Sequence, residues 1–368
     1  MNKDILIIRF SSIGDIVMAL PVAHAIKELY GESCKVIWMT KKIYGGLVEN
    51  NEFIDEVLYF EDFRNNYFRV LKEIVRNYNK YFSKEEMLGP VLFPSILKIL
   101  PSVMNKRKFD LVIDLQGGVE SSIISMMSSK FRLIPGFIDN GIQRFYVKIK
   151  GYDPLRHRVQ DNLDVVRFLG YRGEDIKFGW RFTLEEKKNF ENLCVDNGIL
   201  KNDKYIVCVI RTTWRSKNYP LENWVRIIKY LNDNNKKVII LGGKEEKIAA
   251  EKLEEIIGRN NRLVNLAAKI SLRELIMVVK NCSLVITGDT GPMHIAASLN
   301  KFIIALMGPT DPIKYGPYCK KNKLVLVNHI CRGCNETVCP KGMDCLGDIV
   351  PEKVIEIIRE YTTVEGNI

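Results

Sequence analysis

Short apolar runs alternate with longer amphipathic segments through both halves of the chain. The runs are rich in Val, Ile and Leu and predict strands over 4–10, 35–40, 56–60, 109–114, 204–210, 237–241, 263–266, 283–287 and 302–306. Segments with helical composition predict helices over 16–30, 43–50, 119–129, 158–169, 221–233, 245–257, 271–279, 292–299 and 351–361. This alternation indicates parallel sheets with right-handed crossovers, and the continuous apolar runs indicate strands covered on both faces.

The pattern repeats on either side of a polar stretch, 172–203, that lacks a strong strand pattern. A chain of 368 residues also exceeds one typical core. We therefore expect an α/β fold with a first domain over 1–175, a linker over 176–203, a second domain over 204–350 and a C-terminal helix and tail over 351–368. Two such domains would leave a cleft at the carboxyl ends of their strands, where ligands bind.

The net charge of +11 suits an anionic membrane, an acidic substrate or nucleic acid as a partner. Part of this positive charge is concentrated between residues 130 and 160, a stretch that contains seven Lys or Arg and two Asp. Ordinary solvating charge is the alternative explanation of that stretch. Because no interleaved basic and aromatic platform accompanies it, we expect no nucleic-acid partner.

A long basic and aromatic insert is expected over 64–106, with its most apolar part at 87–104. Three prolines interrupt that part, which predicts either an anchoring segment on a membrane surface or a buried or interdomain helix. No uninterrupted apolar run reaches the roughly 18–20 residues that span a bilayer, and a strand pattern begins at residue 4. The sequence therefore favours a cytoplasmic protein.

The turn Asp289-Thr290-Gly291-Pro292-Met293-His294 joins an expected strand to an expected helix. A helix start presents unpaired N–H groups and a partial positive charge, so this turn favours phosphate. Asp289 and His294 could also hold sugar hydroxyls, whereas His294 could instead only fix the turn.

A second turn between strand and helix, Ser11-Ser12-Ile13-Gly14-Asp15, lies near the N-terminus. It lacks the GxGxxG pattern of dinucleotide binders, which disfavours an oxidoreductase. Gly14 allows close approach of the backbone, and Asp15 lies near the helix start, where a carboxylate is favoured. Asp15 is therefore either a general base or a helix cap.

Four more turns follow strands and carry polar groups. They are Asp114-Leu115-Gln116-Gly117, Lys217-Asn218-Tyr219-Pro220, Gly242-Gly243-Lys244-Glu245 and Gly308-Pro309-Thr310-Asp311-Pro312. In this order the six motifs resemble those of the glycosyltransferase family 9 heptosyltransferases, over about residues 4–355. The chain has Tyr219 where the family usually has Trp.

The resemblance implies a GT-B fold, in which two Rossmann-like domains face each other across a cleft. The N-terminal domain would bind the acceptor and the C-terminal domain the nucleotide-sugar donor. Asp15 matches the proposed catalytic base of an inverting transfer, and Lys217 matches a residue that binds the diphosphate. Exposed loop cations are the alternative explanation of Lys217 and its neighbour Arg215.

The predicted site residues divide between the two substrates. The donor-binding residues are Lys217, Arg215, Glu245, Asp289, Thr290, Gly291 and His294. The acceptor-binding residues are Ser12, Gly14, Asp114 and Gln116. Thr310 and Asp311 are expected to shape a loop.

The function that this resemblance implies is transfer of heptose from ADP-heptose to the lipid A-linked inner core of lipopolysaccharide. No metal or other cofactor is expected. The enzyme would act in the cytoplasm, peripherally at the inner face of the inner membrane, with an anionic membrane surface as a partner. A related transferase that uses another nucleotide sugar, or a non-catalytic nucleotide-sugar-binding protein, is the alternative.

Four of the nine cysteines form a cluster with the pattern Cys331-x2-Cys334-x4-Cys339-x5-Cys345. The spacing differs from paired Cys-x2-Cys knuckles, and thiols in a cytoplasmic chain are normally reduced. A packed thiol loop is therefore favoured over a bound metal, which stays the alternative.

Overall fold

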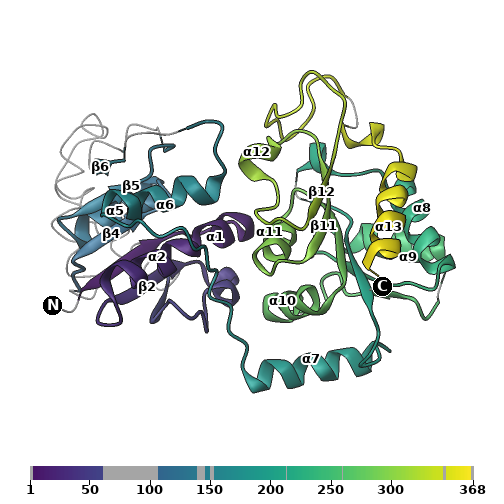
Figure 1. The fold of residues 1–368 in the computed structure, drawn as a ribbon, viewed down its shortest axis with the longest axis horizontal. Coiled ribbons are helices and arrows are strands. Elements are labelled where there is room, and N and C mark those ends of the chain that lie inside the picture. Colours follow the sequence, from purple (N-terminus) through teal and green to yellow (C-terminus); the bar gives the residue numbers. More distant parts are fainter. Residues whose placement is uncertain are drawn as a thin grey trace, which may run out of the picture. The chain divides into compact units, whose positions relative to one another are not determined.

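The computed structural model describes residues 3–60, 107–138, 146–149, 153–212, 214–258, 260–342 and 345–365 (Figure 1). By its internal contacts the chain divides into two units. The first consists of Met1–Ser12, Ala19–Asp153 and Gln160–Arg181, and the second of Ile13–Met18, Pro154–Val159 and Phe182–Ile368. Most of the expected linker, 176–203, therefore belongs to the second unit.

The first unit contains a parallel sheet of six strands in the order β3-β2-β1-β4-β5-β6. The strands are β1 (Asp4–Ile8), β2 (Lys35–Thr40), β3 (Glu56–Tyr59), β4 (Leu111–Asp114), β5 (Arg132–Ile134) and β6 (Val147–Lys148). The central strand β1 is almost fully buried, as its continuous Ile and Leu run predicts.

The second unit repeats this topology with strands β12-β11-β10-β7-β8-β9, again all parallel. They are β7 (Tyr205–Val209), β8 (Lys237–Leu241), β9 (Leu263–Asn265), β10 (Leu284–Gly288), β11 (Phe302–Met307) and β12 (Asn322–Leu326). Numbered within its own unit, each sheet has the order 3-2-1-4-5-6 of the doubly wound Rossmann fold. The two expected parallel-sheet domains are confirmed.

Helices connect the strands in both units. In chain order they are α1 (Ile13–Ala19), α2 (Pro21–Tyr30), α5 (Val119–Ser128), α6 (Arg158–Phe168), α7 (Leu184–Asp196), α8 (Leu221–Asp233), α9 (Lys247–Ile257), α10 (Leu272–Asn281), α11 (Gly291–Ser298), α12 (Pro312–Tyr315) and α13 (Pro351–Glu365), with 3-10 turns η1 (Lys42–Leu47), η5 (Arg215–Lys217) and η6 (Cys345–Asp348). The single helix expected over 16–30 is instead two helices, because Pro21 has no N–H to continue the first one.

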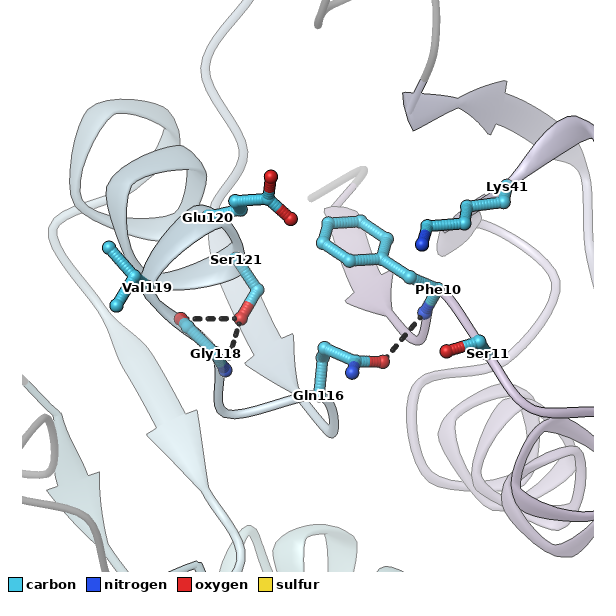
Figure 2. A pocket seen from close by; sticks show the side chains of 8 residues that line it. All are labelled: Phe10, Ser11, Lys41, Gln116, Gly118, Val119, Glu120 and Ser121. Atoms are coloured by element: carbon cyan, nitrogen blue, oxygen red, sulfur yellow. Dashed lines mark hydrogen bonds between the residues drawn. The ribbon is translucent and has the colours of Figure 1, made fainter. Parts of the chain in front are cut away.

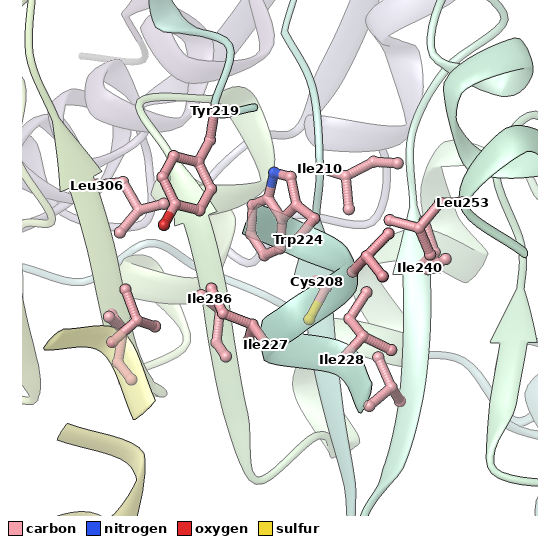
Figure 3. Packing of buried hydrophobic residues seen from close by; sticks show 14 of the residues in the cluster. Cys208, Ile210, Tyr219, Trp224, Ile227, Ile228, Ile240, Leu253, Ile286 and Leu306 are labelled. Atoms are coloured by element: carbon pink, nitrogen blue, oxygen red, sulfur yellow. The ribbon is translucent and has the colours of Figure 1, made fainter. Parts of the chain in front are cut away.

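The core of the second unit surrounds α8 (Figure 3). Trp224, Ile227 and Ile228 pack in one cluster with Cys208 of β7 and Ile240 of β8. Burial of such side chains contributes about 1.5–3 kcal/mol each. This packing fixes the strand ends, and with them the turns that carry the predicted donor residues.

Tyr219, which stands where the family usually has Trp, is part of the same cluster. Its ring meets Trp224 edge-on, with 5.6 Å between the ring centroids. Its hydroxyl donates a 2.7 Å hydrogen bond to the carbonyl of Ile349. The Tyr therefore keeps a buried aromatic and adds a bond to the segment before α13.

The predicted membrane-contacting segment, 87–104, and the rest of the insert over 64–106 lie outside the described residues. Within the described part of the chain, no helix is both long enough and apolar enough to cross a bilayer.

Candidate active site

The predicted donor residues lie in loops at the carboxyl ends of neighbouring strands of the second sheet. Strands β7 and β10 pair directly, with Val209 opposite Thr287 at the end of the ladder. The loop after β7 leads to Lys217, and the loop after β10 begins with Asp289. Because the two strands end at the same edge, residues 72 positions apart in sequence can meet.

Lys217, Asp289 and His294 form one connected cluster. The Lys217 Nζ donates to Asp289 Oδ2 at 2.6 Å, and His294 Nε2 lies 3.5 Å from Asp289 Oδ1. All three side chains are largely buried. The Lys217 ammonium also lies 3.9 Å from the centre of the Trp214 ring, which adds a cation–π contact. The sequence predicted each of these three residues as a donor-binding residue, and the structure shows that they contact one another.

Burial alone would raise the pKa of Asp289, because a carboxylate is poorly solvated inside a protein. The hydrogen bond from His294 and the charge of Lys217 outweigh that effect and lower the pKa to about 2. Asp289 is therefore ionised at neutral pH and acts as an acceptor of hydrogen bonds, not as a proton donor.

The start of α11 offers fewer backbone donors than its sequence suggests. Thr290 is the N-cap, and its hydroxyl oxygen accepts from the Met293 N–H at 3.3 Å. That hydroxyl also lies 2.9 Å from the hydroxyl of Thr287. Pro292 has no N–H, so an anion at this helix start would meet the N–H of Gly291 together with nearby cationic side chains.

The first turn of α1 packs against the first turn of α11 within the second unit. A Cβ added at Gly14 would lie 2.6 Å from His294 Cδ2, and one added at Gly291 would lie 2.6 Å from Ile13 Cβ. Both glycines are therefore required by close packing. Asp15, one residue after Gly14, is the third residue of α1 and is half-buried. It lies in the first turn of the helix, not at the cap position.

Arg215 and Glu245, the two other side chains predicted to bind the donor, are exposed, unlike the largely buried cluster. Arg215 is exposed at the start of η5. Glu245 is also exposed and lies in a turn before α9, which begins at Lys247 and not at residue 245 as expected. The neighbouring Glu246 is buried and accepts the N–H of Gly243 at 2.6 Å. Glu246 thus holds the turn, and Glu245 is the carboxylate left at the surface.

The cysteine cluster lies in a loop that supports the donor-side turns. Ser216 donates from its N–H to the Thr337 carbonyl at 3.1 Å and from its hydroxyl to the Glu336 carbonyl at 2.6 Å. The N–H of Gly333 donates to the Gly308 carbonyl, and that of Asn335 to the Pro309 carbonyl. Residues 333–337 of this loop therefore join the turn that carries Lys217 to the motif at 308–312.

The four thiols of this loop are free cysteines in the structure. Burial raises the pKa of Cys345 to about 11, and the three other thiols of the cluster add to the rise. Among the described residues, no group of three or more His, Cys, Asp or Glu side chains is arranged to hold a metal ion.

The acceptor predictions lie in the first unit, after β1 and β4. Asp114 ends β4 and is fully buried. Its Oδ1 accepts the N–H groups of Gln116 and Gly117, and its Oδ2 accepts the hydroxyl of Tyr146 at 2.6 Å. Burial raises its pKa, against the opposing effect of these hydrogen bonds. These contacts occupy both carboxylate oxygens and shape the turn that presents Gln116.

A pocket of about 270 Å³ lies beside this turn (Figure 2). Gln116 lines it and accepts the N–H of Phe10 through its Oε1 at 3.0 Å. The other lining residues are Phe10, Ser11, Lys41, Gly118, Val119, Glu120 and Ser121. Ser12 and Gly14, predicted as acceptor residues, are not among them.

The basic stretch between 130 and 160 is divided between the two units. Residues 154–159 group with the second unit, whereas the part up to Asp153 groups with the first. Arg158 donates to the Tyr315 hydroxyl at 2.8 Å, and its guanidinium lies 5.4 Å from the centre of that ring. Arg158 therefore packs on Tyr315, while residues 139–145 and 150–152 of the basic stretch lie outside the described part.

The family model described as glycosyltransferase family 9 (heptosyltransferase) matches residues 100–343. The chain belongs to this family. It is a glycosyltransferase, as the six motifs predicted.

Relatives in this family match nearly the whole chain. The lipopolysaccharide heptosyltransferase 1 of Campylobacter coli is 25% identical over 370 residues, covering 97% of this chain and 98% of its own length. A family 9 glycosyltransferase from Veillonella parvula superposes with a TM-score of 0.79 at 19% identity, covering 98% of this chain and 97% of that one. E. coli heptosyltransferase WaaC, solved with ADP, gives 0.69 at 21% identity, covering 97% and 99%. These likenesses confirm the GT-B fold class.

His157 was not among the residues predicted from the sequence, although it joins two distant segments of this glycosyltransferase. Its Nδ1 accepts the N–H of Val159, and its Nε2 lies 2.9 Å from the Gly316 carbonyl, so Nε2 carries the proton. Burial lowers the pKa of His157 to about 4, with help from the nearby charges of His294 and Arg158. No pattern in the sequence indicated that His157 is a partly buried, neutral side chain bonded to the Gly316 carbonyl, because Gly316 is distant in sequence.

We expect His157 to make folding stability sensitive to mild acid. The folded chain keeps His157 neutral down to about pH 4, whereas the unfolded chain protonates it near pH 6.5. The unfolded state therefore binds the extra proton in this window, and the free energy of unfolding falls by up to about 1.4 kcal/mol per pH unit as pH drops. Urea unfolding of the wild type and His157→Asn between pH 7 and 4.5 should show a flatter slope in the variant. Parallel slopes would contradict the assignment.

Proposed function

We propose that this chain is an inverting heptosyltransferase that moves heptose from ADP-heptose to the lipid A-linked inner core of lipopolysaccharide. The observation that carries the proposal is the Lys217–Asp289–His294 cluster, which packs through His294 against the turn before Asp15. The ammonium of Lys217, the buried carboxylate of Asp289 and the half-buried carboxylate of Asp15 therefore belong to the same unit.

In the proposed reaction Asp15 is the general base. It takes the proton from an acceptor hydroxyl as that oxygen attacks the anomeric carbon, and the bond to the diphosphate breaks. A single displacement inverts the configuration at that carbon. Lys217, Arg215 and the N–H of Gly291 would stabilise the negative charge that grows on the leaving diphosphate. Asp289 would hold hydroxyl groups of the donor sugar, and Glu245 those of the ribose.

Two named structures support an adenine nucleotide sugar as the donor. E. coli heptosyltransferase WaaC was solved with ADP and, in a second structure, with ADP-2-deoxy-2-fluoro heptose. The names of the relatives support a lipopolysaccharide acceptor. We propose that the reaction takes place in the cytoplasm, at the inner face of the membrane that holds a lipid A-linked acceptor.

A panel assay tests the proposal. The full chain is incubated with a set of nucleotide sugars and defined lipid A-linked acceptors, and products are read by mass spectrometry and by the anomeric configuration of the new bond. Transfer of heptose from ADP-heptose with inversion is expected. Transfer from another nucleotide sugar would favour the related-transferase alternative, and binding without turnover would favour a non-catalytic protein.

Transfer is expected to need no divalent metal. Lys217 and Arg215 supply positive charge at the proposed diphosphate site, so the leaving group has protein partners. Initial rates in excess chelator should equal those in added magnesium or manganese within about twofold. Loss of activity in chelator that either ion restores would contradict this prediction.

A further inference from the structure

The pocket of the first unit lies where strand order reverses. Lys41 follows β2, Phe10 and Ser11 follow β1, and Gln116 follows β4. Strand β1 lies between β2 and β4, and the order along the sheet turns back between β1 and β4. In doubly wound sheets this point, outside the carboxyl ends of the strands, is where ligands bind.

Hydrogen bonds hold the three strand ends together. The N–H of Lys41 donates to the Phe10 carbonyl at 3.3 Å, and the N–H of Phe10 donates to Gln116 Oε1 at 3.0 Å. Because the Gln116 oxygen is occupied in this way, its amide nitrogen is the end left to donate to a ligand. These two bonds tie together the ends of β1, β2 and β4 at the pocket.

The pocket combines one cation, one anion and neutral polar groups. Figure 2 shows Glu120 on one side of the pocket and Lys41 on the other, with Ser11 on the same side as Lys41 and Gln116 below, between the two sides. Across the part of the chain that the structure describes, neither Lys41 nor Glu120 has an ion-pair partner. A ligand that fits would present an acidic group to Lys41 and hydroxyl groups to the remaining polar atoms.

The volume sets the size of that ligand. At about 270 Å³ the pocket is slightly smaller than typical small-molecule sites, which span roughly 300–1,000 Å³. It suits one sugar ring and not an oligosaccharide.

We propose that this pocket binds one acidic sugar of the acceptor, with the Lys41 ammonium on its carboxylate or phosphate. Ser11, the Gln116 amide nitrogen and Glu120 bind its hydroxyl groups. The proposal rests on the proposed function for the identity of the acceptor. It makes Lys41 a specificity-determining residue, one that the sequence motifs did not mark.

Lys41→Gln tests the proposal, with Lys42→Gln as the matched control because it removes the same charge from the next residue. We expect Lys41→Gln to raise the acceptor KM about tenfold to a hundredfold, with the donor KM unchanged. Lys42→Gln should alter both values by less than about twofold. Equal effects of the two variants on acceptor KM would overturn the proposal.

Modified acceptors distinguish the two sources of the anion. One acceptor has its sugar carboxylates esterified, and another has its phosphates removed. The acceptor that lacks the group bound by Lys41 should give the wild type and Lys41→Gln the same KM, while the other keeps the difference. A full difference with both acceptors would show that Lys41 binds neither group and would contradict the proposal.

A direct binding measurement separates this proposal from the proposed function. Calorimetric titration of the full chain with a monosaccharide acid and with its neutral parent sugar needs no transfer. Binding of the acid that Lys41→Gln weakens and Lys42→Gln preserves would support the pocket even if the panel assay found no heptose transfer. Equal binding of acid and neutral sugar would overturn the pocket even if transfer were observed.

Discussion

Asp15→Asn is expected to lower kcat by about 10²–10⁴ while the Kd for ADP stays within about twofold. Asn keeps the size and the hydrogen-bonding ability of Asp but cannot take a proton. The residue lies in the first turn of α1, next to the Gly14 that packs on His294. The substitution should therefore impair proton transfer from the acceptor hydroxyl. Donor binding should be retained, because it rests on Lys217 and Asp289.

The competing explanation of Asp15 is that its charge only stabilises the start of α1. That role contributes about 0.3–1 kcal/mol to folding. Asp15→Asn would then lower the melting temperature slightly and leave kcat unchanged. Steady-state kinetics, ADP titration and thermal melts of the same preparation separate the two explanations. Asp311→Asn is a useful control, because Asp311 caps α12 through the Ile313 N–H and has no proposed role in proton transfer.

The regular elements could be predicted where the apolar pattern was strong. Expected and observed bounds agree for the strands at 35–40 and 237–241 and for the helix at 221–233. Each strand is buried along most of its length, and the helix has one clearly apolar face that packs on its sheet. A strand or helix face that is buried along its whole length is encoded by a regular apolar pattern, which can be recognised in the sequence.

Helix α7 was missed because it has no buried residues. What defines it is a capping box, in which Thr183 and Glu186 bond each other's backbone N–H groups. Strands β5 and β6 were missed because they span only three and two residues. Their place in the sheet comes from neighbouring strands, which a local pattern does not reveal.

The candidate site could be predicted as a set of turns but not as a set of contacts. Each motif follows a strand, and parallel strands end at one edge of their sheet. That Asp289 bonds both Lys217 and His294 depends on which strands are neighbours. That Gly14 packs on His294 depends on contacts 280 positions apart in sequence, and no spacing rule contains them.

Lys217→Gln is expected to lower kcat/KM by about 10²–10³, because it removes the buried cation proposed to meet the leaving diphosphate. ADP binding should weaken as well. In the structure this ammonium pairs with Asp289, so the same change leaves a buried carboxylate with less compensation. Such a loss costs about 3–5 kcal/mol of stability when no other partner remains. His294 retains a contact with Asp289, so a smaller loss is expected here.

The double variant Lys217→Gln/Asp289→Asn separates these two effects. If Lys217 only neutralised Asp289, removing both charges would restore stability and ADP binding together, because no buried charge would be left unpaired. If Lys217 acts on the diphosphate, the double variant should regain stability, measured by urea unfolding, while the ADP Kd stays as poor as in Lys217→Gln. The ADP Kd is the deciding measurement, because ADP lacks the sugar whose hydroxyl groups Asp289 is proposed to bind. Recovery of ADP binding in the double variant would remove Lys217 from the proposed machinery and would leave the exposed Arg215 and the start of α11 as the groups that stabilise the leaving diphosphate.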